Sequence, residues 1–115
     1  MGIVHHAVYI TWFEEGRSAF TRAIGYPFSR MEAEGLAVAV AEVSARYHSP
    51  ARYDDEVVVT AALDAVQSRG FTFDYTVRGA DGTLLATGRS RQLALDSAGK
   101  VTLLPPALRA ALQAG

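Results

Sequence analysis

The stretch YITWFEEGRSAFTRAI, residues 9–24, decides the fold, because it is the long segment of this 115-residue chain whose apolar side chains have helical spacing. These side chains recur at intervals of three and four residues, at Tyr9, Trp12, Phe13, Phe20, Ala23 and Ile24. Polar residues, among them Arg17 and Thr21, occupy much of the remaining surface, and Gly25 follows as a C-terminal cap. The sequence therefore predicts one amphipathic helix over residues 9–24.

Glycine and proline residues mark a close contact in this helix and a short helix after it. Gly16 lies inside the long helix at a cost of about 1 kcal/mol relative to alanine, which indicates that a neighbouring element packs closely there. Pro27 precedes a short helical segment that ends at Gly35. Because Ser29 and Glu32 have the spacing of a capping box, we expect a short connecting helix between Pro27 and Gly35.

After this short helix, apolar residues alternate with polar ones, a pattern that is typical of β-strands. The alternation predicts four strands, over residues 36–47, 56–66, 71–78 and 83–95. Short turns such as QSRG (67–70) and GADG (79–82) join successive strands, so we expect neighbours to run antiparallel. A last helix is predicted over residues 106–113, where it begins at a proline.

One long helix followed by a meander of long strands has a simple physical solution, in which the sheet curls around the helix and buries it. Gly88 lies in the middle of the last predicted strand and indicates a close approach of that helix or of a ligand. We therefore predict a single domain over residues 1–115 of the α+β class, with a curled antiparallel sheet wrapped around one long helix.

Composition narrows the classes of function. The 11 basic and 12 acidic residues give a net charge of −1, so no long-range field would attract nucleic acid. The absence of cysteine excludes disulfides, a thiolate nucleophile and a cysteine-based metal site. No apolar run approaches the roughly 20 residues of a membrane span, and the N-terminus lacks the order of a signal peptide. We expect a soluble, cytoplasmic protein with no membrane span.

Few residues near the long helix can do acid–base chemistry. His5 and His6 come just before it, where an imidazole or a backbone N–H would meet developing negative charge, but a polar loop explains them equally well. Tyr9 can hydrogen-bond a substrate, although its place on the buried stripe favours the core. Glu14 and Glu15 suit the start of a helix through its dipole, and a catalytic carboxylate is the alternative.

Arginine residues on two predicted strands are candidates for binding phosphate. Arg89 and Arg91 alternate on one strand and would face Arg46 across a sheet, which gives either a phosphate site or a solvated face. The segment RYHSPARYDDE (46–56) adds Arg52 at a charged connection. We find no nucleophile elbow, no glycine-rich phosphate loop and no spaced set of metal ligands, so neither a metal nor a nucleoside triphosphate is expected.

The run MGIVHHAVYITWFEEGR, residues 1–17, resembles the signature of the 4-hydroxybenzoyl-CoA thioesterase family, particularly its Tol-Pal-associated acyl-CoA thioesterase branch. The connection RYHSPARYDDE and the segments LLATGRS (84–90) and GKVTLLP (99–105) extend this resemblance over nearly the whole chain. It implies the hotdog fold, in which dimers join their sheets edge to edge and place active sites at the subunit interface. It therefore implies a homodimer or a homotetramer.

The resemblance also implies a mechanism. The family has an acidic residue three positions before the glycine that matches Gly2, which falls two positions before Met1. That carboxylate attacks the thioester or activates a water, while backbone N–H groups at the helix start, here that of His6, polarise the carbonyl. Three explanations fit its absence: the sequence starts at an internal methionine or is trimmed, the protein is a degenerate member, or Glu14 or another acid substitutes. The first strand of the sheet would be missing as well.

These observations together predict an acyl-CoA thioesterase that hydrolyses an acyl- or aroyl-CoA to the free acid and CoA. The catalytic candidates are His6, Tyr9 and Glu14, and Val8 stands where the family often has asparagine. The candidates for contacts with the phosphates of CoA are Arg46, Arg52, Arg89 and Arg91. No cofactor is expected, because CoA is part of the substrate. The alternatives are a thioesterase acting on acyl carrier protein and a non-catalytic module that binds acyl-CoA.

Overall fold

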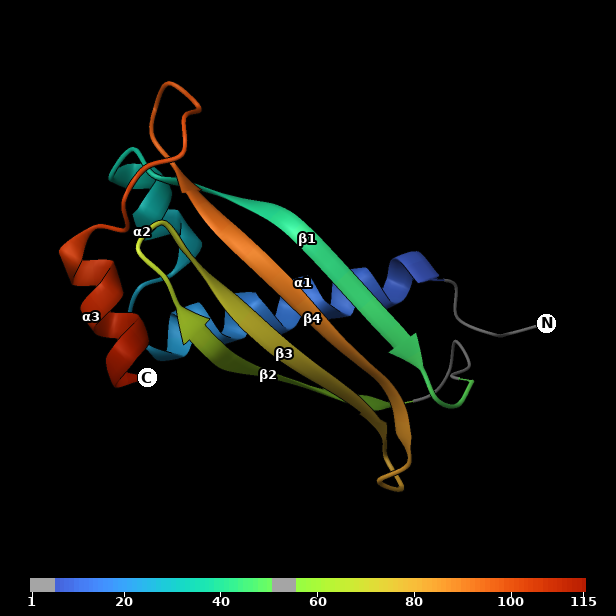
Figure 1. Ribbon diagram of the computed structural model, residues 1–115. Coiled ribbons are helices and arrows are strands. Elements are labelled where there is room, and N and C mark those ends of the chain that lie inside the picture. Colours follow the sequence, from blue (N-terminus) through green and yellow to red (C-terminus); the bar gives the residue numbers. More distant parts are fainter. Residues whose placement is uncertain (1–5, 51–55) are drawn as a thin grey trace.

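The structure of the chain is a computed structural model that describes residues 6–50 and 56–115, with side chains described from Val8 onward (Figure 1). Its elements follow in the order α1 (His6–Ala23), α2 (Phe28–Ala33), β1 (Ala37–Tyr47), β2 (Val57–Val66), β3 (Gly70–Gly79), β4 (Leu84–Leu95) and α3 (Pro106–Ala114). The long helix, the four strands and the last helix all begin and end within three residues of the predicted bounds, so the predicted order of elements is confirmed.

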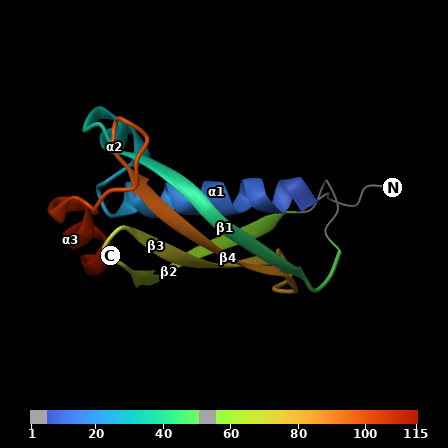
Figure 2. The ribbon, with the colours of Figure 1, turned by 45° about the horizontal axis from the view of Figure 1, so that its top comes forward.

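The four strands form one antiparallel sheet in the order β1-β4-β3-β2. The helix α1 packs against β2 and β3 on one face of this sheet, which we call the inner face (Figure 2). Alternation along β3 turns Phe71, Phe73, Tyr75 and Val77 to the inner face, where each is at most 1% exposed. The predicted α+β class, with an antiparallel sheet around one long helix, is confirmed.

Both glycines that were expected to permit close packing do so. A Cβ atom on Gly88 of β4 would lie 2.3 Å from Cζ of Phe13, so the ring of this α1 residue rests directly on the strand. A Cβ atom on Gly16 would lie 3.2 Å from Cβ of Ala61, which places α1 tightly against β2. The helix therefore lies close to the sheet at both points, and at Gly88 even a methyl group would overlap the ring of Phe13.

Two expectations about the helices were wrong. Arg17 and Thr21 were expected on the solvated surface of α1, yet Arg17 is 6% exposed and Thr21 is fully buried. Arg17 lies one turn after Phe13, and Thr21 lies one turn after Arg17. Residues four apart share one face of a helix, so both side chains point toward the sheet. The capping box was also wrong, because α2 begins after Pro27 in an extended conformation, with no side-chain cap.

Candidate active site

The helix α1 begins at His6, the residue whose backbone amide was expected to stand at the helix start. The first N–H groups of a helix have no partner within it and carry partial positive charge, so this end can polarise a carbonyl oxygen. The side chain of His6 lies outside the described structure, as do His5 and Arg52. Their predicted roles stay predictions.

Tyr9 lies one turn into α1 and is 3% exposed. Its ring packs edge-on against Trp12, with 5.1 Å between ring centroids, and against Tyr47 of β1 at 4.8 Å. These contacts join the first turns of the helix to the end of β1. Tyr9 is therefore part of the core, as its place on the apolar stripe favoured, and its role in catalysis stays a prediction.

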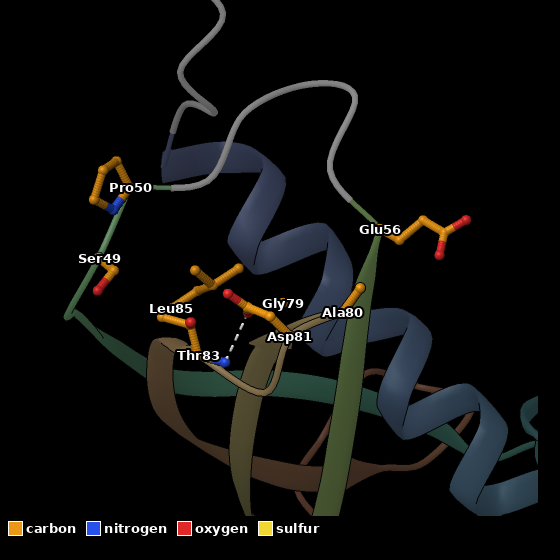
Figure 3. Close-up of a pocket in the computed structure, with 8 residues that line it drawn as sticks. All are labelled: Ser49, Pro50, Glu56, Gly79, Ala80, Asp81, Thr83 and Leu85. Carbon is orange, nitrogen blue, oxygen red and sulfur yellow. Dashed lines mark hydrogen bonds between the residues drawn. The ribbon is translucent and has the colours of Figure 1, made fainter.

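The start of α1 lies at the same end of the molecule as the end of β1, the start of β2 and the hairpin between β3 and β4, as both ribbon views show. A cavity of about 350 Å³, which we call the hairpin cavity, lies among these segments (Figure 3). It is lined by Ser49, Pro50, Glu56, Gly79, Ala80, Asp81, Thr83 and Leu85.

Two carboxylates line the hairpin cavity. Asp81 accepts a hydrogen bond from the backbone N–H of Thr83 at 3.0 Å, and this bond lowers the pKa of its carboxyl group. The bond holds the turn between β3 and β4, so Asp81 has a structural use. Glu56 is exposed, and its carboxylate points away from the cavity in Figure 3. Neither residue is aimed as a catalytic acid in this structure.

Glu14 lines a second cavity, of about 310 Å³, which we call the Glu14 cavity. Its walls come from α1, α2, β1 and β4, namely Glu14, Arg17, Ser18, Phe28, Val38, Val40 and Gln92. Glu14 follows His6 by eight residues, which is about 12 Å along the helix axis. This separation is long for Glu14 and the amide of His6 to act on one carbonyl group within one chain, and the role of Glu14 in catalysis stays a prediction.

A buried polar chain beside the Glu14 cavity was not predicted from the sequence. The Nη1 group of Arg17 donates a hydrogen bond to the hydroxyl of Tyr75 at 3.0 Å, and that hydroxyl bonds Oγ of Ser90. The side-chain amide of Gln92 donates to the same Oγ at 2.6 Å. The alternation of side chains along a strand could have predicted part of this chain, because it places Gln92 on the inner face of β4 together with Ser90.

The three described arginine candidates share the face of the sheet opposite to α1, which we call the outer face. Arg46 of β1 is paired in register with Thr87, the outer neighbour of Arg89 and Arg91 on β4. The sheet therefore separates all three guanidinium groups from α1, and a ligand touching both faces must pass around an edge. Arg46 lies on β1, which is itself an edge strand.

The charge of Arg89 is already compensated. It pairs with Asp64 and lies 3.4 Å from a carboxylate oxygen of Asp74. The hydrogen bond from Arg89, followed by one from Thr72, lowers the pKa of Asp64, and the same pair raises the pKa of Arg89. In residues 6–50 and 56–115, no carboxylate lies within 4 Å of the guanidinium nitrogens of Arg46 or Arg91. These two are better placed than Arg89 to bind an added anion.

The described residues contain no candidate metal site and no candidate membrane-spanning helix. Among them, no three histidine, cysteine or acidic side chains gather closely enough to hold a metal ion. None of the helices that the structure describes is long and apolar enough to cross a membrane.

Known proteins resemble this chain along most of its length. The sequence model of the thioesterase-like superfamily matches residues 1–112. A hypothetical protein of Thermus thermophilus, with a crystal structure, is 34% identical, and the match has a TM-score of 0.94 and covers 99% of this chain and 87% of that one. A curated protein of Aquifex aeolicus (strain VF5), named as a presumed esterase, is 41% identical over 76 residues, which are 66% of this chain and 59% of that protein.

The acyl-CoA thioester hydrolase YbgC of Escherichia coli O157:H7 is 27% identical over 84 residues, which are 73% of this chain and 63% of that protein. The matched part thus spans about three fifths of the length of these two curated relatives, 59% and 63%. This chain belongs to the thioesterase-like superfamily, and its fold is the hotdog fold.

Proposed function

We propose that this member of the thioesterase-like superfamily is an acyl-CoA thioesterase, which hydrolyses an acyl- or aroyl-CoA to the free acid and CoA. The observation that carries the proposal is the start of α1 at His6, at the same end of the molecule as the hairpin cavity. The N–H groups of the first turn of a helix stabilise the negative charge that develops on a thioester oxygen during attack. The resemblance to YbgC, which is named an acyl-CoA thioester hydrolase, supports CoA as the carrier. Membership of the Tol-Pal-associated branch is part of this proposal and rests on the sequence signature alone.

The proposed reaction needs a carboxylate near the helix start. This group attacks the thioester carbonyl, or removes a proton from a water that attacks it, and the bond from carbonyl carbon to sulfur then breaks to release the CoA thiolate. Glu14 lies about 12 Å along the helix from His6 and does not suit this role at the His6 amide. The acid of the family signature, three positions before the glycine that matches Gly2, is therefore the catalytic group of this proposal.

Glu14 is better suited to binding than to attack on that carbonyl. It lines a cavity whose other walls include Phe28, Val38 and Val40, a setting for part of an acyl group. Arg46 and Arg91 would hold the phosphates of CoA, since no described carboxylate pairs with them. No further cofactor is needed, because hydrolysis requires only the substrate, water and a carboxylate.

We also propose a homodimer formed through β1, working in the cytoplasm. Within the described residues, β1 is an 11-residue strand at the edge of the sheet, where a second copy could pair with it. Three of its apolar side chains are well exposed, Val40 at 45% and both Val43 and Tyr47 at 42%. A second β1 would cover both features, whereas the outer face is rich in threonine and charged residues. A tetramer would be a further stacking of such dimers.

Release of free thiol from acyl- and aroyl-CoA esters tests the proposed activity. It should be measured with the 115-residue chain and with a version extended upstream to include the predicted acid. We expect turnover by the extended protein, and its failure to hydrolyse any ester of the panel would refute the proposal. Comparison of kcat/KM for one acyl group on CoA and on acyl carrier protein identifies the preferred carrier. Tight binding of the esters without hydrolysis, even at high enzyme concentration, would instead identify a binding module.

A further inference from the structure

The buried polar chain between α1 and β4 ends at an atom that has no partner. Arg17, Tyr75, Ser90 and Gln92 are each at most 6% exposed, and hydrogen bonds connect them in that order. Gln92 uses its Nε2 group to donate to Ser90. Its Oε1 atom is buried, and no group in the described part of the protein donates a hydrogen bond to it.

An unpartnered carbonyl oxygen is unusual in a protein interior, because burial removes its hydration and leaves nothing in return. The cost is avoidable at this position. The next inward residue of β4 is Ala94, which is fully buried, so an apolar side chain suits this part of the inner face. A glutamine that is fixed by Ser90 at one end and unpaired at the other therefore suggests a use outside folding.

The position of Gln92 suggests what that use is. Gln92 lines the Glu14 cavity, together with Arg17 and the apolar side chains of Phe28, Val38 and Val40. A ligand group that enters this cavity thus meets both apolar and polar walls. Among the described residues, Oε1 of Gln92 is the acceptor there that is buried and has no hydrogen-bond partner. The partner of Oε1 must donate a hydrogen bond, and a hydroxyl group is the neutral donor that an acyl chain can carry. The opposite charges of Glu14 and Arg17 both line this cavity, so neither sign of charge on the ligand is required.

We propose that Gln92 is a specificity-determining residue, whose Oε1 atom accepts a hydrogen bond from a hydroxyl group on the acyl part of the substrate. The substrate class is therefore hydroxylated acyl thioesters rather than plain acyl thioesters of the same length. This inference rests on the proposed thioesterase function for the identity of the carrier. The contact itself does not depend on hydrolysis and is testable by binding alone.

Binding of thioether analogues of acyl-CoA, which cannot be hydrolysed, tests the proposal by calorimetry with the full chain. Three ligands share a six-carbon chain: hexyl-CoA, 6-hydroxyhexyl-CoA and 6-methoxyhexyl-CoA. We expect the hydroxylated ligand to bind about tenfold more tightly than the hexyl ligand, as a buried acceptor gains its partner. The methoxy ligand, which only accepts hydrogen bonds, should bind no better than the hexyl ligand. Equal affinities for all three, or tighter binding of the methoxy ligand, would overturn the proposal.

Two matched variants locate the effect. Gln92→Met keeps a side chain of similar length without an acceptor of this kind and should abolish the preference for the hydroxyl group. Gln113→Met makes the same change on the exposed surface of α3 and should keep it. A preference that persists in Gln92→Met overturns the assignment. If thermal unfolding shows that Gln92→Met does not fold, the affinities of the three ligands for the unaltered chain still test the proposal.

The design separates this inference from the proposed function. Failure of the extended protein to release thiol from any ester refutes the thioesterase and leaves the binding preference intact. Equal binding of the three analogues refutes the role of Gln92 and leaves hydrolysis intact.

Discussion

Substitution of Gly88 by alanine should destabilise the protein strongly, because α1 rests on this position of β4. The added Cβ atom would lie 2.3 Å from Cζ and 2.4 Å from Cε2 of Phe13, and 2.9 Å from the backbone oxygen of Ser44. An ordinary contact begins at 3.4 Å, so the ring must retreat by 3.4 − 2.3 = 1.1 Å. Phe13 is fully buried and stacks on Tyr75 with 4.4 Å between ring centroids, which leaves the ring little room to move.

Overpacking of a core typically costs about 1–3 kcal/mol. The new methyl group would meet Phe13 and the backbone oxygen of Ser44, so we expect Gly88→Ala to lower the free energy of unfolding by about 3 kcal/mol. For a chain of this length, that loss lowers the melting temperature by roughly 10 °C. Urea unfolding and thermal unfolding measure both quantities. Gly16→Ala is the matched control, because its Cβ atom would meet Ala61 at 3.2 Å and the helix would gain about 1 kcal/mol in propensity. It should change the stability by less than about 1 kcal/mol.

A double-mutant cycle with Phe13→Leu tests the cause. The smaller side chain gives the new methyl group space, so the pair of changes should destabilise by less than the sum of the two single changes. Strict additivity, or a Gly88→Ala variant as stable as the unaltered chain, would refute the packing described for α1 on β4.

Three further predictions follow from other contacts. Tyr75→Phe removes the hydroxyl that accepts from the buried Arg17, so urea unfolding should show a loss of about 2 kcal/mol, and no loss would contradict the role of this contact. Arg89 holds the pKa of Asp64 below its ordinary value of 3.8, so the pair stabilises the fold above that pH and the effect fades as the pH falls through the lowered pKa. The melting temperatures of the unaltered chain and Arg89→Met should therefore differ at pH 7 and converge in acid, and a difference that grows in acid would contradict the pairing. Val43→Lys places a charge on the exposed apolar face of β1 and should shift the protein from dimer to monomer in light scattering, whereas an unchanged mass would place the interface elsewhere.

Much of the fold followed from patterns in the sequence that physical chemistry makes robust. The period of the apolar residues changes from helical spacing before Gly25 to alternation after Gly35, and that change predicted the order of elements. The positions of Gly16 and Gly88 predicted where helix and sheet come closest. The cap of α2 was mispredicted, because Pro27 takes the cap position and Ser29 falls inside the helix.

The interior of the candidate site could not be predicted in the same way. Arg17 has a charged side chain, so it was assigned to solvent, although it lies one turn after Phe13 on the buried stripe. Its hydrogen bond to Tyr75 spans 58 positions of sequence, and local patterns carry no information about such a partner. Gln92 is similar, since its importance depends on which atoms of Ser90 and the cavity surround it.

The most direct test of the proposed site compares two acids in the protein extended upstream of Met1. Thiol release from acyl-CoA is measured for the extended protein, for a variant in which the predicted upstream acid becomes its amide, and for Glu14→Gln. We predict that the first variant loses kcat by about 100-fold or more, because the acid acts in the chemical step. Glu14→Gln should retain most of its kcat, because Glu14 lies about 12 Å along α1 from the His6 amide. Loss of activity in Glu14→Gln, with the upstream variant fully active, would contradict the site at the helix start.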